Sequence, residues 1–160
     1  MRLDYNAPHD PERDLILTRV VAAPRARIWA AWTEPDLLKQ WFCPVPWSVS
    51  ACELDVRPGG IFATTMRSPD GKEFPNVGCY LDVVPLERLV WTDALGPGYR
   101  PAANPFMTGI LSLRDVVGGT EYTARAMHRD PATRRKHDEM GFHSGWSTAL
   151  DQLLAMIARD

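Results

Sequence analysis

Residues 134–159, RRKHDEMGFHSGWSTALDQLLAMIAR, decide the fold class of this chain. The stretch contains no proline, and its large side chains recur every three or four positions, which is the spacing of one face of an α-helix. These side chains are Met140, His143, Trp146, Leu150, Leu153 and Ile157. A helix with one apolar stripe must bury that stripe against another layer. The stretch therefore predicts a long C-terminal helix that packs on the rest of the chain.

The layer that receives this helix is predicted from the residues before it. Short segments rich in β-branched and aromatic residues alternate with turn sequences such as PGG at 58–60, PDG at 69–71 and GG at 118–119. The expected strands cover residues 13–22, 47–57, 61–67, 74–84, 88–93, 106–115 and 120–128. Most connections are short enough for hairpins, so the predicted sheet is antiparallel.

Helical spacing also occurs between the first two expected strands. Ile28, Trp29 and Trp32 share one face of a short helix, and a second short helix follows Pro35. Residues 96–105 are rich in glycine and proline and are expected to form an exposed loop. The predicted organisation is a flexible arm over residues 1–12 and one α+β domain over residues 13–160, in which a curved antiparallel sheet grips the C-terminal helix around an apolar cavity.

Composition excludes several classes of protein. The chain has 160 residues, 45% of them hydrophobic, and a formal net charge of -2. Without a large basic field, nucleic acid is not an expected partner. No apolar run is long enough to span a bilayer, and the first residues do not have the pattern of a signal peptide, so a cytoplasmic protein is expected. The three cysteines have no paired spacing, which argues against a disulfide framework or a zinc knuckle.

Five segments, in this order and spacing, resemble a known family. They are TRVVAAPRARIWAAWTEPDLLKQWF at 18–42, DVRPGGIFATTMRSPDG at 55–71, GCYLDVVPLERLVWTD at 78–93, GGTEYTARAMH at 118–128 and GFHSGWSTALDQLL at 141–154. Together they are similar to the activator-of-heat-shock-protein-ATPase-like branch of the SRPBCC, or START-like, superfamily. The resemblance implies a helix-grip fold. It also implies one of three activities: binding of apolar or amphipathic small molecules, polyketide cyclase or aromatase chemistry, or binding to a chaperone in the stress response.

The residues expected to line the cavity are aromatic, methionine and histidine side chains on the inward faces of the strands and the helix. They are Trp41, Phe62, Met66, Tyr80, Trp91, Phe106, His128, Phe142, His143 and Trp146. Alternation in the last strand turns Tyr122, Ala124, Ala126 and His128 inward. The same residue types would also build an ordinary core, so the sequence leaves a ligand pocket and a filled interior as alternatives.

Three residues are candidates for acid–base catalysis. His128 and His143 are expected to converge where the last strand meets the helix, and Asp82 is expected on the inward face that also carries Tyr80. Ligand spacing for a metal is absent, as are phosphate-binding and nucleophile-elbow motifs, so no metal and no cofactor are expected.

The leading hypothesis is a domain that holds an apolar or aromatic ligand between sheet and helix. Two alternatives remain open: an enzyme of the cyclase or dehydratase kind that uses the cavity His and Asp residues, and an interaction module that stimulates a chaperone ATPase. Expected partners are an apolar or amphipathic small molecule and, on the third hypothesis, a chaperone. Exposed edge strands also leave a homodimer open.

Overall fold

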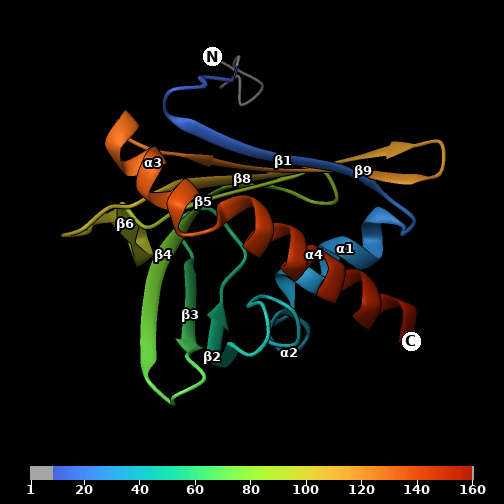
Figure 1. Cartoon of the computed structure of the whole chain (residues 1–160), viewed down its shortest axis with the longest axis horizontal. Coiled ribbons are helices and arrows are strands. Elements are labelled where there is room, and N and C mark those ends of the chain that lie inside the picture. Colours follow the sequence, from blue (N-terminus) through green and yellow to red (C-terminus); the bar gives the residue numbers. More distant parts are fainter. Residues whose placement is uncertain (1–8, 160) are drawn as a thin grey trace.

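The computed structural model describes residues 9–159, and residues 1–8 of the predicted arm lie outside this range. Seven strands form one antiparallel sheet in the order β1-β9-β8-β5-β4-β3-β2 (Figure 1). They are β1 (Asp14–Val21), β2 (Ser48–Leu54), β3 (Ile61–Arg67), β4 (Glu73–Val84), β5 (Arg88–Thr92), β8 (Thr108–Val116) and β9 (Gly119–Met127). Each agrees with a predicted strand to within a few residues at its ends. The α+β fold with an antiparallel sheet is therefore confirmed.

Two short helices follow β1, as the sequence predicts: α1 (Arg25–Thr33) and α2 (Pro35–Leu38). The expected loop over residues 96–105 is more ordered than predicted. It begins with β6 (Leu95–Gly96), the 3-10 turn η1 (Pro97–Tyr99) and β7 (Arg100–Pro101), and β6 pairs with β7. Gly98, with a φ of 74°, allows the reversal, and its N–H donates to the Gly59 carbonyl at 2.8 Å.

The predicted long C-terminal helix is confirmed as α4 (Phe142–Arg159), but its predicted start at residue 134 is wrong, because residues 134–139 belong to a separate helix, α3 (Pro131–Glu139). Gly141 lies between them with a φ of 96°, a conformation that favours glycine and ends helices. Helix α3 also begins earlier than predicted, since the Asp130 carboxylate caps it by accepting from the Thr133 N–H at 2.7 Å. Within the described residues, no helix is both long and apolar enough to cross a membrane.

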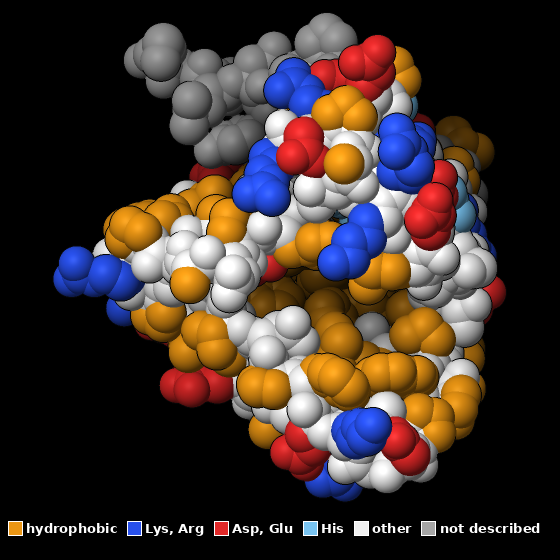
Figure 2. Space-filling view, turned by 60° about the vertical axis from the view of Figure 1, so that its left-hand side comes forward, with side chains coloured by type: hydrophobic (Ala, Val, Ile, Leu, Met, Phe, Trp, Pro, Cys, Tyr) orange, Lys and Arg blue, Asp and Glu red, His pale blue; other side chains and the backbone are white. Residues whose placement is uncertain are grey.

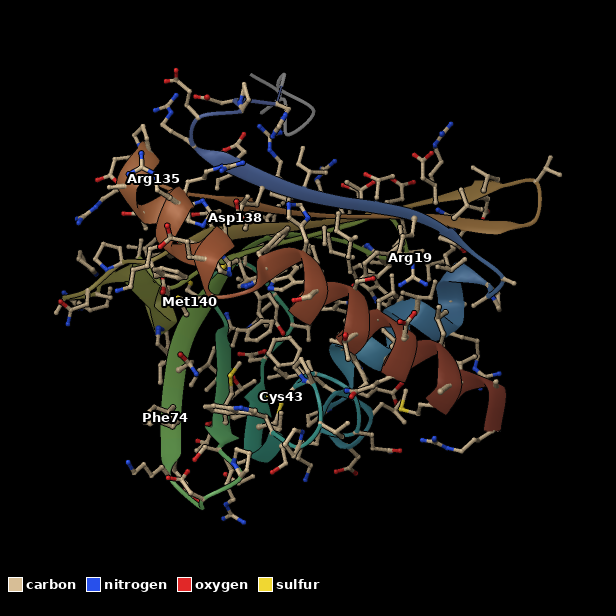
Figure 3. All side chains as sticks on the ribbon, in the orientation of Figure 1. Arg19, Cys43, Phe74, Arg135, Asp138 and Met140 are labelled. Atoms are coloured by element: carbon tan, nitrogen blue, oxygen red, sulfur yellow. The ribbon has the colours of Figure 1, made fainter. Side chains whose placement is uncertain are left out.

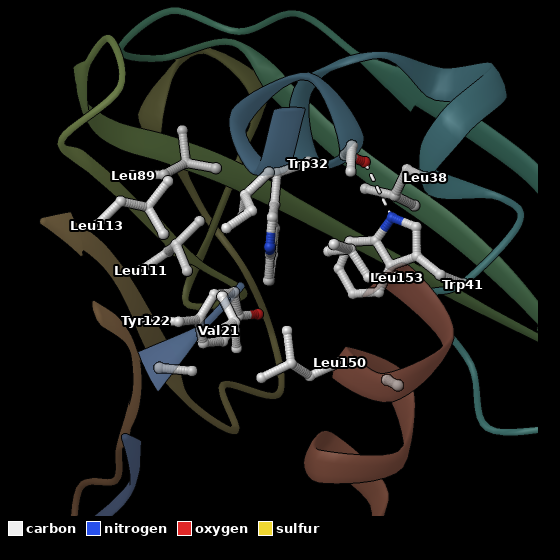
Figure 4. Packing of buried hydrophobic residues seen from close by; sticks show 14 of the residues in the cluster. Val21, Trp32, Leu38, Trp41, Leu89, Leu111, Leu113, Tyr122, Leu150 and Leu153 are labelled. Atoms are coloured by element: carbon white, nitrogen blue, oxygen red, sulfur yellow. Dashed lines mark hydrogen bonds between the residues drawn. The ribbon is translucent and has the colours of Figure 1, made fainter. Parts of the chain in front are cut away.

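Helix α4 crosses the inner face of the sheet and closes the main core (Figure 1). Leu150 and Leu153 of α4 are fully buried, as are Leu89 and Leu111 on the central strands (Figure 4). The expected stripe on the helix is only partly confirmed. Trp146, Leu150, Leu153 and Ile157 pack on the core, whereas Met140 and His143 are exposed. The break at Gly141 takes Met140 out of the helical register that the prediction assumed.

The outer face of the sheet carries a buried ion pair. Arg125 of β9 donates to the Asp14 carboxylate of β1 from Nη2 at 2.6 Å and from Nε at 3.2 Å. The Arg125 side chain is 9% exposed and that of Asp14 is 4% exposed. The Asp10 backbone N–H donates to the same carboxylate oxygen at 3.0 Å. Charges so well removed from water require this pairing.

A close approach in the middle of the sheet depends on glycine. Gly109 of β8 lies opposite Trp91 of β5, and the Trp91 ring lies over it. A Cβ atom added at Gly109 would stand 2.3 Å from the Trp91 ring. In this position the Trp91 ring stacks on Phe62, with ring centres 5.7 Å apart and planes at 18°. Gly109 therefore makes room for an aromatic wall on the inner face.

Candidate functional site: the inner hollow and the histidine pair

The inner face of β2, β3 and β4 extends beyond the part that α4 covers. Register places Met66 beside Phe74 and Thr64 beside Asn76, all on the face that carries Phe62. Thr64 is buried, yet Asn76 is exposed and 47% of Phe74 is exposed. The inner face is therefore open to solvent toward the β3–β4 turn.

Large exposed hydrophobic side chains from three separate segments lie on this side of the molecule. Trp47 precedes β2 and is 38% exposed, Phe74 lies on β4, and Met140 follows α3 and is 67% exposed. The Trp47 and Phe74 rings are 5.6 Å apart. Phe74 and Met140 lie on the same side of the molecule (Figure 3), and the view that brings this side forward shows a hollow with hydrophobic side chains inside it (Figure 2). We call this region, which carries Trp47, Met66, Phe74 and Asn76 and has Met140 on the same side of the molecule, the inner hollow.

Three of the expected ligand-binding residues form one packed group deeper on the inner face. Phe62 lies between Trp91 and Tyr80, with ring centres 5.7 Å and 5.1 Å away. Tyr80 is fully buried, and its hydroxyl has no hydrogen-bond partner among residues 9–159. Burial raises the pKa of the Tyr80 phenol far above its usual value, so the group stays protonated. An unpaired buried hydroxyl is uncommon in proteins.

Trp41 has a structural role rather than a place on an open surface. Its side chain is 2% exposed, and its indole N–H donates to the Ala31 carbonyl at 3.0 Å. Trp32 packs against it, and the Trp32 indole N–H faces the Tyr122 hydroxyl without forming a close hydrogen bond (Figure 4). Burial raises the pKa of Tyr122, and the Trp32 neighbour opposes that rise. These rings fill the interior between α1, α2 and the sheet.

The expected meeting of His128 and His143 does not occur. His143 is exposed on α4, because the helix begins at Phe142 and turns position 143 toward solvent. His128 instead meets His137 of α3, with His128 Nε2 2.9 Å from His137 Nδ1. His128 is buried, with an exposed fraction of 7%. Sequence reasoning missed His137 because it lies among charged residues at positions 134–139.

Aromatic rings enclose His137. The centres of Phe106, Phe142 and Trp146 lie 4.9, 5.2 and 6.1 Å from the imidazole centre. All three were expected to line the cavity, and the structure gathers them here rather than beside Phe62 and Tyr80. Burial, followed by the neighbouring His128, lowers the pKa of His137 to about 4.

The predicted position of Asp82 on the inner face is wrong. Tyr80 pairs with Trp91 and Asp82 with Val90, so β4 has one extra residue between them. Such a bulge reverses the alternation and moves Asp82 to the opposite face from Tyr80. There the Asp82 carboxylate is half-buried and accepts from Arg88 Nε at 2.9 Å. Asp82 is thus part of a surface ion pair outside the inner hollow.

The cysteines are free thiols. Burial raises the pKa of the Cys43 thiol to about 11, so it is not a reactive thiolate at neutral pH. Among residues 9–159, no group of three His, Cys, Asp or Glu side chains is placed to hold a metal ion.

A wide depression of about 660 Å³ lies on the outer face of the sheet. Its wall contains Arg88, Arg114, Glu121 and Arg125, and the ion pairs include Arg114 with Glu121 at 3.0 Å. Such a mixed-charge surface differs from the hydrophobic inner hollow, so the two faces of the sheet offer different chemistry.

One α4 side chain fixes the segment that leads to the rim of the inner hollow. The Gln152 amide donates to the carbonyls of Trp41 at 3.0 Å and Cys43 at 2.8 Å, and accepts from the Val45 N–H at 2.9 Å. All three bonds hold the chain just before Trp47. We expect this segment to depend on Gln152 for its position.

Gln152→Leu keeps the size of the side chain and removes all three bonds. Because two carbonyls would lose their protein partner, we expect the free energy of unfolding to fall by about 2 kcal/mol. Urea unfolding measures this change. Gln40→Leu is the matched control, since the Gln40 amide donates only to the Asp36 carbonyl on an exposed helix end and its loss should cost less than about 0.5 kcal/mol. Equal losses in the two variants would contradict this role for Gln152.

The chain matches one family model over most of its length and is similar to several solved structures. The family model described as activator of Hsp90 ATPase homolog 1-like protein matches residues 22–158. A crystal structure from Nitrosomonas europaea is 49% identical, with a TM-score of 0.92, and the match covers 94% of this chain and 97% of that chain. No curated protein matches the chain.

More distant structures share the fold. A protein from Mycobacterium smegmatis is 25% identical, with a TM-score of 0.79 over 95% of this chain and 96% of that chain. The AHSA1-like protein from Aeromonas hydrophila is 18% identical, with a TM-score of 0.70 over 91% and 92% of the two chains. The second of these similarities concerns the fold alone.

Proposed function

The chain belongs to the family of activator of Hsp90 ATPase homolog 1-like proteins, and we propose that it binds an apolar or aromatic small molecule in the inner hollow. The fold family supports a ligand-binding domain in general. The observation that carries the specific proposal is the hollow with hydrophobic side chains inside it (Figure 2), together with the exposed and mutually packed Trp47 and Phe74. A hollow with large apolar side chains around it favours the binding of an apolar ligand.

The unpaired Tyr80 hydroxyl supports the same proposal. A buried hydroxyl without a hydrogen-bond partner lowers the stability of the fold. A hydrogen bond to a polar group of a ligand, or to a bound water, would offset this cost. Tyr80 shares the inner face with Asn76 and Phe74, which lead out to the rim. A ligand lying along this face would therefore have an apolar rim and a polar contact at depth.

A bulky substitution on the inner face tests the proposal. Asn76→Trp places a large ring in the inner hollow at an exposed position, so the fold should tolerate it while the ligand loses space. We expect wild-type protein to bind the neutral probe N-phenyl-1-naphthylamine, and Asn76→Trp to weaken that binding by about tenfold or more. Fluorescence titration measures both affinities.

Val77→Trp is the matched control, because Val77 is the next residue, is 50% exposed and points to the outer face. It should leave the affinity unchanged. Absence of probe binding by the wild-type protein, together with no ligand in native mass spectrometry of protein purified from its own host, would overturn the proposal. Equal weakening of probe binding by both variants would indicate that the probe binds outside the inner hollow.

The two alternative functions predict different effects of substitutions on partner binding and on turnover. A chaperone-binding module would keep its partner when Asn76→Trp fills the hollow. For a cyclase or dehydratase, only His128 of the three catalytic candidates is buried, whereas His143 is exposed and Asp82 lies on the other face. Turnover lost in His128→Gln with probe binding retained would favour the enzyme.

A further inference from the structure

Hydrogen bonds define which nitrogen of each buried histidine carries a proton. His128 Nδ1 lies 2.8 Å from the Arg13 carbonyl oxygen, which can only accept, so Nδ1 carries the hydrogen. A neutral imidazole has one N–H, so His128 Nε2 then accepts. His137 Nδ1, 2.9 Å away, must be the donor in this contact. The lone pair of His137 is consequently on Nε2.

The His137 Nε2 lone pair has no protein partner among the described residues. The buried polar atoms without a partner are Trp32 Nε1 and Tyr80 OH, so His137 Nε2 retains some accessible surface although the residue is only 8% exposed. The low pKa of His137 keeps the ring neutral at neutral pH, despite the Asp138 carboxylate, which opposes that shift. The geometry thus leaves a hydrogen-bond acceptor that keeps some accessible surface.

Three aromatic rings surround the imidazole that carries this acceptor. Phe106 lies two residues before β8, and Phe142 and Trp146 come from α4. Phe142 and Trp146 also contact each other, with ring centres 4.6 Å apart. His137 lies one helical turn before Met140, which is on the same side of the molecule as Phe74 of the inner hollow (Figure 3). The acceptor therefore lies at the end of α3 that faces this side.

Resting on the proposed function, we propose that His137 Nε2 is the polar anchor of the site and selects aromatic ligands that carry a hydroxyl group. The ligand hydroxyl donates to Nε2 while its ring packs against Phe106 and Trp146. His128 is a positioning residue, because it fixes the His137 tautomer and does not itself contact the ligand. A phenolic hydroxyl suits the acceptor, since it donates strongly and its ring is planar.

Naphthalene and 2-naphthol test this anchor, since they differ only by the hydroxyl group. We expect wild-type protein to bind 2-naphthol about tenfold more tightly than naphthalene, the usual contribution of one hydrogen bond. In His137→Phe, which keeps a ring and removes the lone pair, the two affinities should become equal. His143→Phe is the matched control and should keep the preference, because His143 is exposed and its ring contacts Phe142, 5.0 Å away, rather than His137.

A measurement on the unaltered protein covers the case in which His137→Phe does not fold. The nitrogen resonance of His137 Nε2 should move when 2-naphthol is added and stay in place when naphthalene is added. Equal binding of the two compounds, with an unmoved Nε2 resonance, would overturn the anchor while leaving the proposed function standing. A preference that survives in folded His137→Phe would also overturn it. Binding of neither compound would count against the proposed function itself.

Discussion

Arg125→Met should lower the free energy of unfolding by about 3–5 kcal/mol, the typical cost of removing one partner from a buried ion pair. The Asp14 carboxylate would remain buried between β1 and the neighbouring strands, with the Asp10 N–H as its remaining backbone donor. Methionine fills much of the space of the arginine stem, so the loss would come mainly from the uncompensated charge. The midpoint of urea unfolding measures the change.

Arg114→Met provides the control on the same face of the sheet. Arg114 donates to Glu121 at 3.0 Å, but the Arg114 side chain is 71% exposed, so its removal should cost less than about 1 kcal/mol. The double variant Asp14→Leu with Arg125→Met should recover much of the lost stability, because no charge then remains buried. A single variant at Arg125 that unfolds at the same urea concentration as Arg114→Met would contradict the importance of the buried pair.

Gly109→Ala should destabilise the protein by about 3 kcal/mol, at the upper end of the usual cost of overpacking. Its Cβ would stand 2.3 Å from the Trp91 ring, while the backbones of β5 and β8 hold the two residues opposite each other. Trp91 must then tilt away and lose its stack on Phe62. Thermal unfolding measures the stability, and the near-ultraviolet circular dichroism of the tryptophans reports the tilt.

Gly96→Ala is the comparison, because a Cβ there meets nothing closer than the Arg100 carbonyl oxygen at 3.8 Å. Its effect should stay within about 0.5 kcal/mol. Combining Gly109→Ala with Trp91→Leu should restore part of the stability, since the smaller side chain leaves room for the new methyl group. An unchanged dichroism spectrum in Gly109→Ala would contradict the proposed movement of Trp91.

The strands could be predicted from the sequence because residue alternation and turn sequences, which lie within or next to each strand, determine them. Alternation in β9 places Tyr122, Ala124 and Ala126 on one buried face, and the structure has them there. Turn sequences such as PDG at 69–71 fix where the chain reverses. Position along a regular strand determines which way a side chain points, so these assignments require no knowledge of distant contacts.

Other residues were misplaced because their positions depend on single irregularities. One extra residue in β4 moves Asp82 to the outer face, and the residue sequence of β4 contains no signal that predicts this bulge. The left-handed glycine at position 141 was detectable in principle, since it follows a charged helix and precedes a new apolar run. A helix end at Gly141 separates α3 from α4, and His137 of α3, rather than His143 of α4, meets His128.

The break at Gly141 also has a consequence for protein engineering. Helix α4 supplies Leu150 and Leu153 to the main core, whereas α3 contributes His137 to the ligand anchor proposed above. Met140 and Gly141 join the two helices, and the proposed ligand contacts come from both, with His137 on α3 and Trp146 on α4. A library that varies α3 while leaving α4 and Gly141 unchanged would explore new ligand preferences on a scaffold whose core is intact.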